Sequence, residues 1–294
     1  MGHHFCCLRR MTTKITIITL SCAILLTFSC EKNVSSSDQR TVGSSSVDQY
    51  IESSYPVVTA VSQPISPNIG GYLESLPASY ALHPGKRYPL LIFLEGIGGT
   101  GPGTVLSLTN LERSCVFAVI NKHELPPNIT VNGVNYQFIT IEPQFKYSPY
   151  SSDINDVLNF CIKKYRVDTS KVYMSGVSLG GGALWDYTVD YGKRLSAIVP
   201  IAAQSWPELI KGQKIAQSGV CVWAFHNLYD PHVPVSYTED YVKYINESNP
   251  RVPARMTIFP DSGHNAWKAA LDPTYRENGQ NVYEWMLSTS DVNY

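Results

Sequence analysis

The sequence predicts an α/β fold with a doubly wound, mainly parallel sheet flanked by helices. Short apolar runs alternate with segments whose apolar residues recur at helical spacing, which is the pattern of strands joined by helical crossovers. The run 88–94 is apolar along its whole length, as a strand covered on both faces requires. Further strands are expected at 138–141, 171–175, 197–201, 220–225 and 256–259, and helices at 153–165, 179–191, 237–247 and 282–287.

Length and composition limit the classes of function. The chain has 294 residues and a net charge of −1, so it is long enough for one sizeable α/β core. It contains no basic stripe, CxxC pair, zinc-protease motif, Walker loop, dinucleotide fingerprint or internal repeat. We therefore expect no nucleic-acid partner, no metal and no cofactor.

The N-terminal segment has the features of an export signal. Arg9, Arg10 and Lys14 precede an apolar run, 15–28, that is too short to span a bilayer comfortably. This run ends in Thr-Phe-Ser-Cys, which resembles the lipobox of bacterial lipoproteins and implies lipidation of Cys30. An uncleaved anchor or an ordinary secretory signal is the alternative.

These features predict three parts of the chain: a lipoprotein signal peptide (1–30), a Ser-rich flexible tether (31–54) and a catalytic domain (55–294). We expect an exported protein, anchored by lipid to the periplasmic or cell-surface face of a bacterial membrane. After the leader, the cysteines Cys115, Cys161 and Cys221 remain, an odd number that leaves at least one unpaired. Cys161 and Cys221 lie in apolar segments and are expected to be buried.

A candidate nucleophile lies between a predicted strand and a predicted helix. Residues 176–180 read Gly-Val-Ser-Leu-Gly, the G-x-S-x-G spacing of a strand–turn–helix elbow. Such a turn lifts the hydroxyl of Ser178 clear of the backbone, and its glycines leave room for that approach.

A serine nucleophile needs a base, and histidine is the usual one. His264 directly follows the last predicted strand, where a loop at the carboxyl edge of the sheet would place it. His232, in a Pro-flanked loop that reaches the same edge, is a rival base. His226 ends a strand and is expected to be a hydrogen-bonded structural residue, and His123 is expected on the surface.

The base in turn needs an acid that fixes its orientation. Asp230 follows the penultimate strand and gives the order Ser178, Asp230, His264, which α/β-hydrolases show. Asp261 is the competing acid, although its place three residues before His264 suits it better to shaping the turn.

Five motifs together resemble one superfamily. Over residues 69–288 the chain is similar to the α/β-hydrolases of the carboxylesterase, acyl-protein-thioesterase and dienelactone-hydrolase branch, and more narrowly to exported feruloyl-esterase-like and polyhydroxybutyrate-depolymerase-like lipoproteins. The resemblance is carried by 71–77, 93–101, 176–180, 230–234 and 263–267. It implies a serine ester hydrolase that acts through an acyl-enzyme on carboxylic esters, such as acetyl or feruloyl esters of polysaccharides, and therefore a small-molecule or oligosaccharide ester as partner.

The resemblance also implies an oxyanion hole made by the backbone N–H groups of Ile97 and Leu179. A plain Gly-rich turn is the alternative for the loop after 88–94. Glu95 stands where the family usually has histidine. We expect its side chain to point away from the hole, braced by backbone N–H groups of its own loop or by a cation. A carboxyl group kept neutral by burial is the alternative.

Other features leave alternatives open. Trp206, Trp267 and Glu95 are candidate substrate contacts, although core packing is the commoner role of tryptophan and is expected for Trp185. The segment 121–137 is expected to be a loop or small hairpin over the sheet's edge that could help form a lid. A prolyl-oligopeptidase-like peptidase and a non-catalytic surface binding module are the alternative functions.

Overall fold

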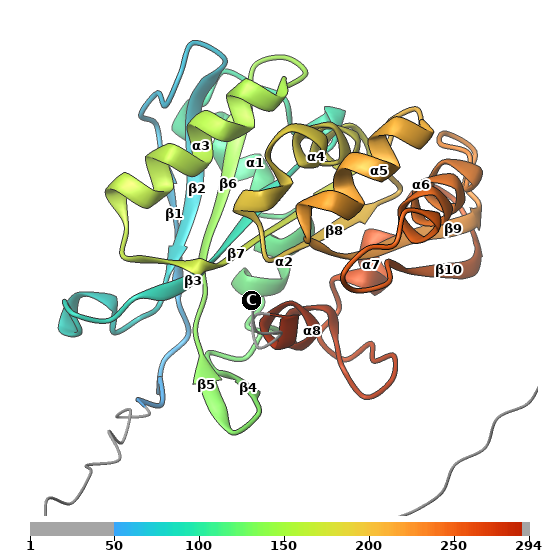
Figure 1. Cartoon of the computed structure of the whole chain (residues 1–294). Coiled ribbons are helices and arrows are strands. Elements are labelled where there is room, and N and C mark those ends of the chain that lie inside the picture. Colours follow the sequence, from blue (N-terminus) through green and yellow to red (C-terminus); the bar gives the residue numbers. More distant parts are fainter. Residues whose placement is uncertain (1–49, 290–294) are drawn as a thin grey trace, which may run out of the picture. The chain divides into compact units, whose positions relative to one another are not determined.

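In the computed structural model, which describes residues 50–289, one sheet of eight strands runs through the domain (Figure 1). The strand order is β1-β2-β6-β3-β7-β8-β9-β10. β2 pairs antiparallel with β1 and β6, and the pairs from β6 to β10 are parallel. The predicted mainly parallel sheet is therefore confirmed. The strands are β1 (Val57–Val61), β2 (Ile69–Leu76), β3 (Tyr88–Leu94), β6 (Ile139–Phe145), β7 (Val167–Val177), β8 (Ala197–Ile201), β9 (Cys221–Tyr229) and β10 (Arg255–Ser262).

Helices cover both faces of the sheet, as a doubly wound fold requires (Figure 1). One face carries α3 (Ser151–Lys164), α4 (Ser178–Tyr191), α5 (Leu209–Ser218) and α6 (Ser236–Glu247). The other carries α1 (Val105–Leu111), α2 (Cys115–Asn121), α7 (Trp267–Ala270) and α8 (Val282–Ser288). The expected helices and strands are all present, whereas β1, β2, α1, α2 and α5 were not predicted.

The apolar run of β3 shows how the two faces are built. Leu90, Ile92 and Leu94 pack into the core under α3 to α6, and Leu91 and Phe93 pack into the core on the opposite face. Successive side chains of a strand point to opposite faces, so a strand covered on both sides must be apolar at every position. This is why the run was recognisable in the sequence.

The segment 121–137 contains the expected hairpin, formed by β4 (Ile129–Val131) and β5 (Val134–Tyr136). Its last residue, Gln137, accepts a hydrogen bond of 2.6 Å from Lys86 Nζ, just before β3 begins. The hairpin leads directly into β6. The end of the hairpin segment therefore lies at the amino ends of β3 and β6. The candidate site residues follow the opposite, carboxyl ends, and the lid hypothesis is therefore wrong.

Cys115, Cys161 and Cys221 are buried free thiols, as expected for the last two. Trp185 is also buried, stacked on Tyr241 with 4.4 Å between ring centroids. The predicted signal peptide, Cys30 and most of the tether lie outside the described residues. Within residues 50–289, no helix has both the length and the apolar character that a membrane span needs.

Candidate active site

The candidate nucleophile lies at the junction of β7 and α4. Ser178 is the first residue of α4, and its φ of 51° is in the left-handed region, which non-glycine residues rarely adopt. Such strain costs on the order of 1–3 kcal/mol and is commonly found at functional sites. Gly180 lets the helix approach the end of β3, because a Cβ atom there would overlap the carbonyl oxygens of Leu94 and Glu95.

Two backbone N–H groups predicted as oxyanion donors lie beside this serine. Ile97 opens a 3₁₀ turn, Ile97–Gly99, and Leu179 is the second residue of α4. The first N–H groups of a helix have no acceptor within it, so they are free to point at a ligand. A Cβ atom on Gly96 would lie only 3.4 Å from Ser178 Cβ, which places the turn next to the nucleophile.

Parallel pairing brings the other two predicted residues to the same edge of the sheet. Val177 at the end of β7 is level with Ile201 at the end of β8, which is level with Phe225 near the end of β9. Asp230 follows β9 and His264 follows β10. The two side chains are joined by a hydrogen bond of 2.7 Å between His264 Nδ1 and Asp230 Oδ2.

Asp230 is built as an acceptor. Its Oδ1 accepts the backbone N–H groups of His232 (2.8 Å) and Val233 (3.1 Å), while Oδ2 faces His264. Burial alone would raise the pKa of Asp230, but the bonds from His264 and the two N–H groups outweigh it, and the net pKa is lowered. The carboxylate is thus held ionised against His264 Nδ1.

His226 supports the loop that carries this acid. Its ring is fully buried and bonded to Thr238 Oγ1 (2.8 Å) through Nδ1 and to the Val233 carbonyl oxygen (3.0 Å) through Nε2. Nε2 must carry the proton, since a carbonyl can only accept. Burial lowers the pKa of His226 and favours this neutral form. The expectation of a hydrogen-bonded structural residue is confirmed.

Asn227 holds the loop of the candidate base and was missed in the sequence. This buried amide donates to the Gly263 carbonyl oxygen (2.9 Å) and to Asn265 Oδ1 (2.8 Å), on either side of His264. The signal that could have found it is its place at the end of β9, three residues before Asp230. Trp267 completes the surroundings, edge-on to the His264 ring at 5.8 Å.

The rival residues lie elsewhere or are otherwise engaged. His232 is exposed, its ring lies 5.3 Å from that of His264, and it is His264 that bonds to Asp230 Oδ2. Asp261 is exposed within β10, and His123 is exposed and stacked on Tyr55 at 4.3 Å. Among the described residues, Ser178 and His264 share the edge but no hydrogen bond, a contact that commonly forms only in the substrate complex.

Glu95 follows β3, next to the predicted oxyanion turn, and its side chain lies on the α2 side. A Cβ atom on Gly99 would overlap Glu95 Cγ, and Cys115 Sγ donates to Oε1 at 3.6 Å. Burial raises the pKa of Glu95, opposed by hydrogen bonds from Cys115, Ser114 and the Gly96 backbone. No cation pairs with it within residues 50–289, so the neutral-carboxyl alternative fits this environment better than a charge-paired brace.

A second carboxyl group, absent from the sequence prediction, lies near the first. Glu142 in β6 is fully buried, and within the described residues neither of its oxygens has a hydrogen-bond partner. Burial first, and then the neighbouring carboxyl group of Glu95, which would repel a second negative charge when ionised, raise the pKa of Glu142 well above its ordinary value. No group of three or more His, Cys, Asp or Glu side chains is arranged to hold a metal ion in the described part of the chain.

This burial has a consequence for stability. Because the folded state keeps the Glu142 proton after the unfolded state, with its ordinary pKa of 4.5, has lost it, stability should fall as pH rises above that value. The slope from one proton is at most about 1.4 kcal/mol per pH unit. We expect Glu142→Gln to remove this slope and to be more stable than the wild type at neutral pH.

Urea unfolding at several pH values between about 5 and 8 measures this difference. Glu247→Gln, an exposed change at the end of α6, is the matched control and should keep the wild-type slope. A stability difference for Glu142→Gln that stays constant over this range would contradict the assignment.

We compared the chain with known proteins by sequence and by structure. No protein-family model and no curated protein sequence matches the chain. A thermostable esterase superposes with a TM-score of 0.57 at 20% identity, covering 79% of this chain and 62% of that one. A ferulic acid esterase gives a TM-score of 0.53 at 17% identity, covering 75% and 96% of the two chains. The Staphylococcus aureus fluorophosphonate-binding serine hydrolase F gives 0.56 at 13%, covering 81% and 100%.

The chain has the α/β-hydrolase fold. In this fold the nucleophile elbow is the G-x-S-x-G turn, and acid and histidine follow it in chain order. The oxyanion hole combines the residue after the nucleophile with the loop after the third strand. In this chain Ser178 lies in such a turn, Asp230 and His264 follow it in chain order, and the predicted donors are Leu179, directly after the serine, and Ile97, in the turn after β3.

Proposed function

We propose that this protein is a serine ester hydrolase that works through an acyl-enzyme. The hydrogen bond of 2.7 Å between His264 and Asp230, at the edge where Ser178 occupies a strained elbow, carries this proposal. The names of the structural neighbours, which include a thermostable esterase and a ferulic acid esterase, support it. These residues suffice for ester hydrolysis.

The proposed reaction has two halves. Ser178 Oγ attacks the ester carbonyl carbon while His264 Nε2 takes the hydroxyl proton, and Asp230 stabilises the resulting imidazolium. The tetrahedral oxyanion accepts the N–H groups of Ile97 and Leu179, and loss of one such donor costs roughly 3 kcal/mol of barrier. His264 then gives the proton to the departing alcohol. Water repeats these steps on the acyl-enzyme, which releases the acid and restores Ser178.

The proposed substrates are carboxylic esters, with acetyl or feruloyl esters of polysaccharides foremost. A feruloyl esterase module from Clostridium thermocellum, whose S954A mutant was solved with sinapinate, superposes with a TM-score of 0.53 at 14% identity and supports an aromatic acyl group. A prolyl-oligopeptidase-like peptidase is the alternative, because the same constellation can cleave amides. A non-catalytic binding module is a second alternative.

A parallel assay tests the proposal. The purified chain is given short p-nitrophenyl esters, acetylated and feruloylated oligosaccharides, and dipeptide amides. We expect hydrolysis of the esters. Hydrolysis of the amides without the esters would favour the peptidase, and absence of any turnover would favour the binding module.

We also propose export and anchoring by lipid, with residues 1–30 as signal peptide and 31–54 as tether. The basic residues, apolar run and lipobox-like end of the leader support this. We expect Cys30→Ser to stop incorporation of labelled palmitate and to release the protein from membranes, since acyl chains rather than an apolar helix would hold it. Labelled palmitate in the variant would contradict the lipidation of Cys30.

A further inference from the structure

The loop between β8 and α5 presents a large apolar ring to solvent. Trp206 is 67% exposed. One exposed apolar residue is ordinary in itself. Trp206 differs from an ordinary exposed residue in two respects: hydrogen bonds hold its backbone, and its loop contacts the candidate nucleophile.

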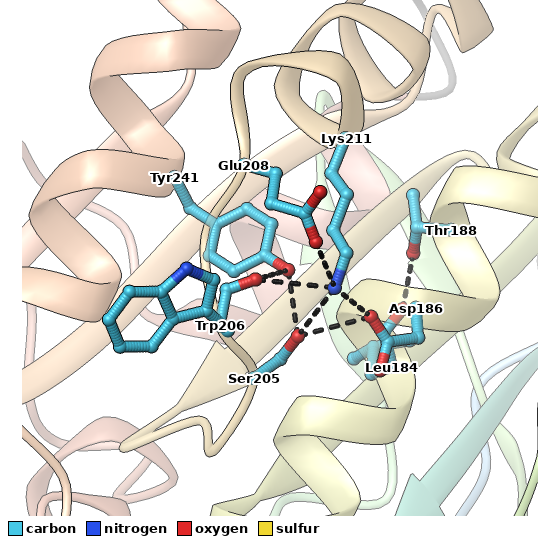
Figure 2. Close-up of polar contacts among 8 residues, drawn as sticks. All are labelled: Leu184, Asp186, Thr188, Ser205, Trp206, Glu208, Lys211 and Tyr241. Carbon is cyan, nitrogen blue, oxygen red and sulfur yellow. Dashed lines mark hydrogen bonds and ion pairs between the residues drawn. The ribbon is translucent and has the colours of Figure 1, made fainter.

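A network of hydrogen bonds and ion pairs holds the backbone of this loop (Figure 2). Tyr241 Oη and Lys211 Nζ both donate to the Trp206 carbonyl oxygen at 3.2 Å. Ser205 Oγ lies 2.8 Å from Tyr241 Oη, and Lys211 pairs with Asp186 Oδ1 at 2.9 Å. Tyr241 is fully buried, so one of the two groups that hold the Trp206 carbonyl oxygen is part of the core. The exposed indole therefore stands on a rigid base, which lowers the entropy cost of binding.

The same loop contacts the candidate nucleophile. The Gln204 N–H, two residues before Trp206, donates to the Ser178 carbonyl oxygen at 2.9 Å. On its other side, the Trp206 ring meets the ring of Tyr237 edge-on at 5.4 Å. Tyr237 lies in the first turn of α6, just after the loop that carries Asp230. The loop of Trp206 thus contacts Ser178 through its backbone, and the indole contacts the helix that follows the loop of Asp230.

The surroundings of the indole select among ligands with an apolar face. Asp186 and Glu208 lie beside the loop that carries Trp206, where both pair with Lys211, and their side chains are 50% and 52% exposed (Figure 2). An alkyl chain or a lipid surface laid over this region would desolvate both carboxylates, and the single positive charge of Lys211 offsets only one of them. A pyranose ring has C–H faces that pack on an indole and hydroxyl groups at its edge that donate to carboxylates.

We propose that Trp206 is the stacking platform of a saccharide subsite beside Ser178, with Glu208 as hydroxyl acceptor and Lys211 as positioning residue. The subsite receives a sugar ring of an ester-bearing oligosaccharide, so this inference rests on the proposed function and specifies its substrate. It also explains why an exposed loop is tied to buried groups.

Binding in the absence of turnover tests the subsite. Isothermal titration of the full chain carrying Ser178→Ala uses xylotetraose, cellotetraose and mannotetraose as probes. We expect at least one of these saccharides to bind. Adding Trp206→Ala should weaken its affinity by about tenfold or more, whereas adding Trp206→Phe should keep most of the affinity. Tyr55→Ala, which removes another exposed ring before β1, should not change the affinity. Thermal melts verify that each variant is folded.

Lys211→Met should give a partial loss of affinity, because it removes one of the two donors to the Trp206 carbonyl oxygen without removing the ring. Equal binding by Trp206→Ala and its parent, or no binding of any probe, would overturn the subsite. So would Trp206-dependent binding of phospholipid vesicles in place of the saccharides. These results are independent of catalysis. Ester hydrolysis without saccharide binding would refute the subsite but not the proposed function. Trp206-dependent binding in a chain that hydrolyses no ester would support the subsite and refute the proposed function.

Discussion

Ser178→Ala is expected to lower ester turnover by about ten-thousand-fold to a million-fold while leaving the fold intact. The variant removes the oxygen that forms the acyl-enzyme, and the oxyanion donors alone retain little activity. Alanine adopts the strained φ of 51° no more easily than serine does, so the elbow is under similar strain in both proteins. Removal of one half-buried hydroxyl should change the melting temperature little.

A fluorophosphonate probe measures this directly, because it labels only an activated serine. We expect labelling of the wild type and of Ser170→Ala, an exposed change in β7, the strand that leads into Ser178, and none of Ser178→Ala. Labelling that persists in Ser178→Ala would show that another residue is the nucleophile.

Much of this edge was predictable because it depends on local sequence and one rule of topology. The elbow needs only a strand, a tight turn with glycines and a helix, all of which lie within a short stretch around Ser178. Asp230 and His264 follow apolar runs, and parallel strands end at a common edge. Their proximity could therefore be inferred without knowing the strand order.

What could not be predicted depends on tertiary contacts. β6 continues past the predicted end at Ile141 to Phe145. This extension was missed because Glu142 and Gln144, which are buried within it, break the apolar pattern. α5 was missed because half of its positions carry polar side chains, and Ile215 and Ala216 are among the few that are buried. The hairpin of 121–137 was recognised, but only strand pairing shows at which edge it lies.

In the candidate site, too, features set by local sequence could be predicted, and features set by tertiary contacts could not. His226 could be assigned a structural role from its place at the end of a strand, but its bond to Val233 belongs to the folded loop. Asn227 carries no motif at all. The environment of Glu95 depends on Cys115, which lies in another element, so the sequence could raise the question of its charge without answering it.

Asp230→Asn is expected to lower turnover by about ten-thousand-fold, whereas Asp261→Asn should change it little. The reason lies in the two oxygens of Asp230. Oδ1 accepts two backbone N–H groups, from His232 and Val233, so the oxygen of an asparagine must stay at that position. Its NH₂ group then faces His264 Nδ1 in place of the carboxylate oxygen.

An NH₂ group can only donate, so His264 Nδ1 has to become an acceptor and the ring proton moves to Nε2. In that tautomer Nε2 cannot take the proton of Ser178, and the imidazolium formed in the reaction would lose its carboxylate partner. The fold should survive, because the side chain keeps its shape and its two backbone bonds. Turnover of p-nitrophenyl acetate and thermal melts of both variants measure this. If Asp261→Asn lost more turnover than Asp230→Asn with both proteins folded, the acid would have to be reassigned to Asp261.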